Sequence, residues 1–205
     1  MKNFVFTFPL LFCFHLAYNQ SLLLKGGLNY ANLSKASVSQ FNSSSRSGWF
    51  IGGGLVPGNG FLRFNSEILY SKQGYDFKNG NTTGKVDLQY LLLPQTIGVY
   101  IGPVQIHAGL QFGFLLNSQG DTTSTTGTTG DIKSVLKQIT KLNFSAIAGA
   151  EFSPVEALLI GIRYNHALGN ILQKDAVTGN TVFAPDKNLK SNLLQLYVGL
   201  RFKGQ

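Results

Sequence analysis

The sequence is short of cysteine and of charge. Its 205 residues include one cysteine, Cys13, and 13% charged residues, where a soluble domain usually carries about 25%. A single cysteine excludes a disulfide framework within the chain. The apolar run from Phe4 to Leu16 is shorter than the roughly 20 residues that a helix needs to span a bilayer. These shortages are not typical of a helical cytosolic protein or of a disulfide-rich scaffold.

The first 20 residues are interpreted as a cleavable signal peptide. Lys2 provides a positive start, the apolar run follows, and "AYNQ" offers a cleavage region between Ala17 and Ser21. Because Phe12 precedes Cys13, we do not expect a lipoprotein signal. We therefore expect residues 21–205 to form one exported domain that contains no thiol.

The formal net charge is +8, but the lysines and arginines are spread singly along the chain. A nucleic-acid site needs a basic patch or arm. No such cluster occurs in the sequence, so nucleic acid is not an expected partner.

Apolar residues alternate with polar residues or glycine over many short segments. In "VQIHAGLQFGFLL", residues 104–116, every even position is apolar, which predicts a strand because side chains alternate faces along a strand. The same pattern recurs over 142–152, 158–164 and 194–202, and less regularly over 22–30, 49–55, 62–70 and 86–101. In the last of these the apolar parity switches beside Pro94, which predicts a β-bulge there.

The connections between these eight segments alternate in length. Long polar stretches (31–48, 71–85, 117–141 and 170–192) alternate with tight turns at 57–60, 102–103 and 154–156. In an up-and-down meander this places all long loops at one end, as in outer-membrane barrels. The predicted fold is therefore all-β: an eight-stranded antiparallel up-and-down transmembrane β-barrel.

The two faces of the strands distinguish a membrane barrel from a soluble one. The apolar face carries almost no charge, and the other mixes glycine with arginine, glutamate and glutamine. A soluble, secreted, lipocalin-like ligand-binding barrel would turn its apolar face inward, and it remains the alternative. Aromatic rings near the loop ends of the strands are expected at the membrane interface; they belong to Tyr30, Trp49, Tyr70 and Tyr164.

The polar face predicts a charged network in the lumen. An eight-stranded barrel is just wide enough for side chains, so we expect ion pairs to fill it, with a small pore or ligand conduit as the alternative. His107 and His166 lack a neighbouring acid or serine in a catalytic arrangement, so we expect no enzyme, cofactor or metal. The predicted network consists of Lys25, Arg63, Glu67, Asp87, Glu151, Arg163 and Arg201.

The long loops carry most of the excess positive charge. We expect outer-membrane lipid and lipopolysaccharide as partners of a monomer, with the loop lysines facing lipid phosphates. Within the third loop, "DIKSVLKQITK" has apolar residues at helical spacing and Asp131 as an N-cap. It predicts a short helix over residues 131–141.

Several stretches resemble the PorT-like outer-membrane β-barrel proteins of Gram-negative bacteria. "AIAGAEFSPVEALLIGIRYNHALGNI" and "NLLQLYVGLRF" are similar to the last three strands of that family, and "KGGLNYANLS" and "SEILYSKQGYDF" also resemble it. The resemblance implies an eight-stranded barrel in the outer membrane and no active-site residues. Since some members are linked to protein secretion, it implies an accessory role in secretion or envelope maintenance. The sequence departs from the family by continuing past Phe202 into "KGQ".

Overall fold

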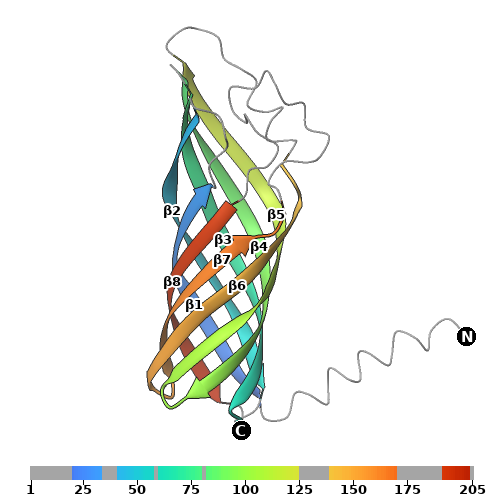
Figure 1. Ribbon diagram of the computed structural model, residues 1–205, viewed down its shortest axis with the longest axis vertical. Coiled ribbons are helices and arrows are strands. Elements are labelled where there is room, and N and C mark those ends of the chain that lie inside the picture. Colours follow the sequence, from blue (N-terminus) through green and yellow to red (C-terminus); the bar gives the residue numbers. More distant parts are fainter. Residues whose placement is uncertain are drawn as a thin grey trace, which may run out of the picture.

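Eight antiparallel strands form one closed barrel in chain order (Figure 1). The computed structural model describes residues 20–33, 41–57, 60–79, 82–124, 139–169 and 191–203. The all-β, eight-stranded, up-and-down fold is therefore confirmed. The strands are β1 (Gln20–Leu33), β2 (Phe41–Pro57), β3 (Leu62–Asn79), β4 (Thr82–Ile101), β5 (Val104–Ser124), β6 (Leu142–Val155), β7 (Leu158–Ala167) and β8 (Ser191–Lys203).

The barrel closes between its first and last strands. β1 pairs with β8 from Ser21↔Lys203 to Leu33↔Ser191, so the sheet has no open edge. The β4–β5 turn contains Gly102, whose φ of 59° favours glycine. This turn and the β6–β7 turn lie at the lower end of Figure 1, where β8 also ends. We call this the short-turn end and the opposite one the loop end.

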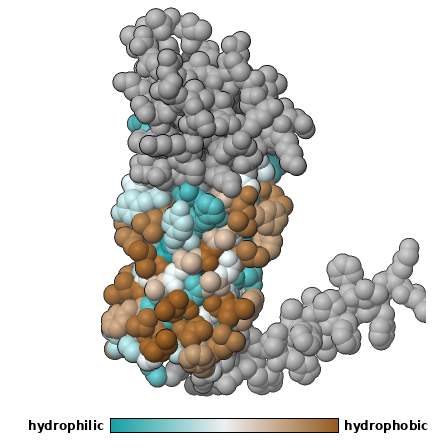
Figure 2. Space-filling model, viewed as in Figure 1, coloured by the Kyte–Doolittle hydropathy of each residue, from teal (hydrophilic) through white to brown (hydrophobic). Residues whose placement is uncertain are grey.

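The outer surface of the lower barrel is apolar. Side chains such as Leu24, Ile51 and Ile106 are about half exposed, at 48%, 59% and 57%, and Figure 2 shows hydrophobic residues over much of the described surface. The outward row of β5 from Val104 to Leu116 rises about 30 Å at a tilt near 40°, enough to cover an apolar band about 25 Å tall. Because the apolar rows face outward, the lipocalin-like alternative is wrong.

Aromatic side chains lie on the outer surface near the upper limit of this band. The rings of Trp49 and Tyr70 pack at a centroid distance of 5.5 Å. The next outward residue of β3 after Tyr70 is Lys72, and on β4 the outward row changes from Leu91 to Gln89. The outer surface thus turns from apolar to polar at this level, which suits amphipathic rings.

Beyond this level the outer face of the sheet is polar and its inner face is apolar. β2, β3, β4 and β5 have 17, 18, 20 and 21 residues, whereas β7 has 10. These four strands extend past the band, and we call this part the extension. In this extension Lys85 is exposed and Asp87 is partly exposed on the outer face, whereas Val86 and Leu88 are buried inside. Apolar side chains that face inward under a polar outer face are expected where water surrounds a sheet, so we infer that the extension lies outside the membrane.

The β-bulge predicted beside Pro94 is wrong. β3 and β4 keep one register across Pro94, and the even-numbered residues of β4 are buried from Gly84 to Gly98. The apolar parity switches because the surroundings change from water to lipid, while the backbone alternation is unbroken. A register shift occurs instead on β5, where Leu116 is the extra residue opposite Gln89 and Tyr90.

The long loops expected over 31–48, 71–85 and 117–141 are shorter than predicted, because the strands extend into each of these ranges. β3 continues to Asn79 and β4 begins at Thr82, because polar residues continue the hydrogen-bonded ladder where the apolar alternation stops.

The helix expected over 131–141 lies largely outside the described residues; its last three residues are not helical, and Ile139 forms a β-bridge. The expected signal peptide also lies outside them, except Gln20. The described residues contain no helix that is both long and apolar enough to cross a membrane.

A charge placed in the middle of the outer band should destabilise the barrel. Leu110 is 52% exposed on the outward row of β5, and Leu110→Arg is expected to lower the unfolding free energy by about 2–4 kcal/mol. Thr83→Arg, on the outer face of the extension, is the matched control and should change it by less than about 0.5 kcal/mol. Urea unfolding in lipid vesicles measures both; equal losses would contradict the proposed boundary.

Candidate functional site

A cluster of charged side chains crosses the lumen of the lower barrel. Lys25 Nζ donates to Glu67 Oε1 at 2.7 Å and to Glu151 Oε1 at 2.6 Å. Arg163 Nη2 donates to both oxygens of Glu67 at 2.9 Å, and the Tyr197 hydroxyl donates to Glu151 Oε1 at 2.9 Å. We call these five residues the lumen cluster. It joins β1, β3, β6, β7 and β8.

The lumen cluster is electrically balanced and buried. Its two cations and two carboxylates are each at most 3% exposed, and such burial is costly unless every charge is paired and hydrogen-bonded. The ring of Tyr197 adds two cation–π contacts, at 4.8 Å from Lys25 Nζ and 5.4 Å from Arg163 Cζ. Removal of one partner would therefore leave an uncompensated charge in the lumen.

A glycine makes room for the tyrosine of the lumen cluster. Gly161 on β7 is the register partner of Tyr197 on β8, and a Cβ added at Gly161 would overlap the tyrosine ring. The ring can cross the lumen because this position has no side chain. Small and large residues thus alternate inside the barrel, as expected for a narrow lumen.

Two further layers fill the barrel toward the loop end. Asn29 donates to Ser71 Oγ at 2.8 Å and accepts from Gln195 Nε2 at 2.9 Å, and Asn165 donates to Gln195 Oε1 at 3.1 Å. These side chains form an amide layer just above the lumen cluster. Above it lies an apolar layer of buried side chains, most of them in the extension: Tyr75, Val86, Leu88, Tyr90, Leu92 and Ile139.

The structure brings together four of the seven residues that the sequence placed in one network: Lys25, Glu67, Glu151 and Arg163. Arg63 and Arg201 lie instead at the short-turn end. The assignment of Asp87 to the lumen is wrong, because this residue is partly exposed on the outer face of the extension, between the inward-facing Val86 and Leu88. The error arose from treating the apolar parity of β4 as lipid-facing along its whole length.

Sequence reasoning missed Tyr197, which contacts both cations and one carboxylate of the lumen cluster. Its signal is parity: it stands between Gln195 and Gly199, both on the inward face of β8. Counting strictly by twos along β8 would have placed it inside.

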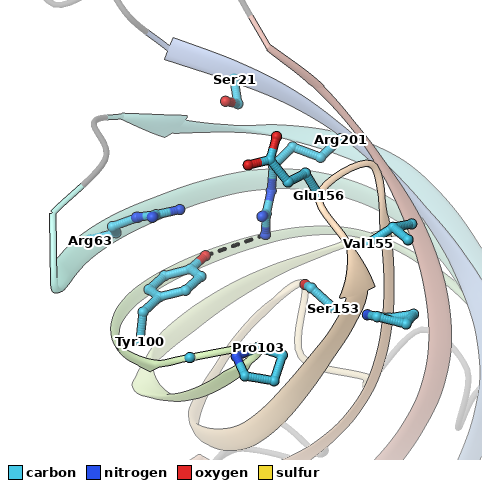
Figure 3. A pocket seen from close by; sticks show the side chains of 10 residues that line it. Ser21, Arg63, Tyr100, Pro103, Ser153, Val155, Glu156 and Arg201 are labelled. Carbon is cyan, nitrogen blue, oxygen red and sulfur yellow. Dashed lines mark hydrogen bonds between the residues drawn. The ribbon is translucent and has the colours of Figure 1, made fainter.

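The short-turn end contains a cavity of about 550 Å³ (Figure 3). The guanidinium of Arg63 stacks on the ring of Tyr100 at 3.8 Å. Arg201 Nη2 donates to the hydroxyl of the same tyrosine at 3.4 Å. Glu156, on the β6–β7 turn, lies beside Arg201 in Figure 3. We call this cavity the arginine mouth.

The two histidines of the described barrel lie on opposite faces of its wall. His107 is 2% exposed in the lumen, and neither ring nitrogen has a hydrogen-bond partner there. His166 is exposed on the outer face of β7. Among the described residues, no group of three His, Cys, Asp or Glu side chains could hold a metal ion.

Removal of Arg163 tests the charge balance of the lumen cluster. Arg163→Met leaves Glu67 and Glu151 with only one cation, and the unfolding free energy should fall by about 3–5 kcal/mol. Adding Glu67→Gln in the same chain should recover part of this loss, which a double-mutant cycle in urea would measure. Arg63→Met, which removes a half-buried arginine outside the cluster, should cost less than about 1 kcal/mol. Strictly additive losses for Arg163 and Glu67 would contradict the coupling.

The chain is similar in fold to several solved outer-membrane proteins. Ail of Yersinia pestis, solved with the heparin analogue sucrose octasulfate, is 12% identical; the match covers 90% of this chain and 99% of Ail, with a TM-score of 0.48. Neisserial surface protein A is 14% identical over 88% and 97% of the two chains, with a TM-score of 0.48. OprG of Pseudomonas aeruginosa is 13% identical over 90% and 96%, with a TM-score of 0.44.

Among curated proteins, none matches the chain. The family model described as "Outer membrane protein beta-barrel domain" matches residues 20–173, which include β1 to β7. This range is more than half of the chain, and its strands, outward apolar band and polar lumen have the architecture of such barrels. The chain therefore belongs to the outer-membrane β-barrel domain family.

Proposed function

We propose that this protein is a non-conducting outer-membrane barrel with a structural and interaction role. In the orientation usual for such barrels, the short-turn end faces the periplasm and the loop end faces the outside. The proposal includes export by the signal peptide of residues 1–20 to the outer membrane of a Gram-negative cell. It assigns no catalytic step to the protein.

The lumen cluster is the observation that carries this proposal. Its four charged side chains are nearly inaccessible and are paired with one another. The amide layer and the apolar layer fill the barrel above it. A solute would have to break buried ion pairs to pass, so the surfaces at the two ends are better suited to a function than the lumen is.

The extension of β2 to β5 is the surface proposed for interaction. It rises above the rest of the barrel in Figure 1, and its outer face carries charges of both signs. Lys85 stands in register between Asp76 and Asp121 on the neighbouring strands. Alternating signs favour a protein partner over a uniformly anionic surface.

Lipid is the second proposed partner. The apolar band contacts the acyl chains, and Lys72 is the first outward residue of β3 above the aromatic pair of Trp49 and Tyr70. At this level a lysine can reach lipid phosphates, so we propose lipopolysaccharide contact at Lys72. Most other lysines of the expected loops lie outside the described residues.

The biological setting that we propose is accessory work in protein secretion or envelope maintenance. It follows the resemblance to PorT-like proteins, which rests on strand patterns such as the one from Asn192 to Phe202. The extension supplies a surface that such an accessory protein could offer to a cargo or to an envelope partner.

Planar-bilayer recording tests whether the lumen conducts. The purified barrel, inserted at a density checked by immunodetection, is expected to give no discrete openings because the lumen cluster blocks its middle. Empty bilayers in the same detergent are the control. Reproducible single-channel steps from the folded protein would overturn the non-conducting role and favour the small pore.

Shortening the extension tests the interaction role. Gln73 and Leu88 are register partners, so replacing residues 74–87 by Asn-Gly should close a shorter hairpin and leave the apolar band intact. A deletion strain complemented with this variant should keep the altered secreted and surface proteomes of the deletion, whereas the native chain and Thr83→Ala should restore them. Assembly of each variant is checked by heat-dependent migration in electrophoresis. Full restoration by the shortened barrel would contradict the role of the extension.

A further inference from the structure

The arginine mouth has the size and shape of a ligand site. Its volume of about 550 Å³ lies within the roughly 300–1,000 Å³ of small-molecule pockets. Five strands (β1, β3, β4, β6 and β8) and two turns contribute to its wall, so residues distant in the sequence converge there (Figure 3). The lining includes Ser21, Arg63, Tyr100, Pro103, Ser153, Val155, Glu156 and Arg201.

Its two arginines are held in place by the protein. Arg63 Nε donates to the carbonyl of Gly60 at 3.0 Å, and its guanidinium stacks on Tyr100. Arg201 lies 5.9 Å from the centroid of the same ring, and its Nε is buried without a hydrogen-bond partner in the described structure. Arg201 Nε is not exposed to the cavity, but a guanidinium has five N–H donors and Arg201 lines the cavity, so its Nη groups can donate to an acceptor on a ligand.

The charge of the arginine mouth suits a singly charged anion. Arg63 and Arg201 contribute two positive charges and Glu156 one negative charge, which leaves +1 in the lining. The lumen cluster above it is neutral and does not cancel this charge. A planar guanidinium binds a carboxylate through two parallel hydrogen bonds.

The lining also contains groups that could contact the amide N–H and the apolar side chain next to the C-terminal carboxylate of a peptide. The carboxylate of Glu156 is an acceptor for an amide N–H and lies beside Arg201 in Figure 3. Pro103 and Val155 provide apolar contact at the rim. Donors for a carboxylate and an acceptor for an N–H therefore face one cavity.

We propose that the arginine mouth binds the C-terminal carboxylate of a peptide on the short-turn side of the membrane. Arg201 and Arg63 donate to the carboxylate, and Glu156 accepts from the last amide N–H of the peptide. Ligand entry does not require passage through the lumen. The proposal does not depend on the interaction role of the extension. That role is tested by the secreted and surface proteomes, whereas this proposal is tested by peptide binding.

Peptide binding to the full-length barrel in detergent micelles tests the proposal. The probes are N-acetyl tri-alanine with a free carboxylate, the same peptide with an amidated C-terminus, and inorganic phosphate, each titrated by calorimetry and by NMR of the arginine Nε–H groups. We expect the free acid to bind and to shift the Arg201 signal, and amidation to weaken binding about tenfold or more. Arg201→Gln should weaken it similarly, and Arg201→Lys should restore only part of the affinity. Lys72→Gln, at the loop end, is the matched control and should leave affinity unchanged.

Three results would overturn the proposal: no binding of the free acid, equal binding of the amidated peptide, or phosphate binding as tightly as the acid. If Arg201→Gln fails to assemble, Glu156→Gln on the exposed turn replaces it. This substitution removes the negative charge, so phosphate should bind several-fold more tightly while the preference for the peptide acid over phosphate falls. An unchanged preference would show that Glu156 does not select the ligand and would also overturn the proposal.

Discussion

The hydrogen-bonded closure between β1 and β8 is the constraint on which the rest of this structure depends. A bilayer offers no water to an unpaired backbone N–H or C=O group, so a sheet can cross it only when it has no edge. Thirteen register partners from Ser21↔Lys203 to Leu33↔Ser191 remove that edge. Closure with eight strands makes the lumen narrow, and the narrow lumen in turn requires side chains that fit one another in size and charge.

Lipid surrounds one part of the barrel and water another, and this difference explains why the apolar parity of β4 changes along the strand. The backbone of β4 alternates without interruption, yet its apolar residues face inward at Val86 and Leu88 and outward at Ile97 and Val99. Lipid requires an apolar exterior, and water requires an apolar interior. A change in apolar parity within an unbroken strand therefore marks a membrane boundary. The outward-facing pair of Trp49 and Tyr70 lies close to the same level.

The interior satisfies its charges by neutrality and by contacts across the lumen. Arg163 meets Glu67 over a separation of 96 residues in the sequence, and Lys25 meets Glu151 over 126. Such pairs depend on strand tilt and stagger, which no single strand encodes. Tyr197 fits among them because Gly161 has no side chain. The two arginines of the short-turn end do not join this neutral cluster, which is why they carry net charge into the arginine mouth.

The sequence by itself determined the strand number, the alternation of faces and the lipid-facing rows in the lower barrel, because a two-residue period is a local property of each strand. It also indicated that Lys25, Glu67, Glu151 and Arg163 face the lumen. Only the tertiary structure decided which charges pair, that Arg63 and Arg201 form a separate mouth, and that Asp87 lies outside. It also decided how far the strands continue, because backbone pairing does not depend on apolar side chains. These outcomes depend on register and on the level of the membrane boundary, and both arise only when eight strands are assembled in lipid.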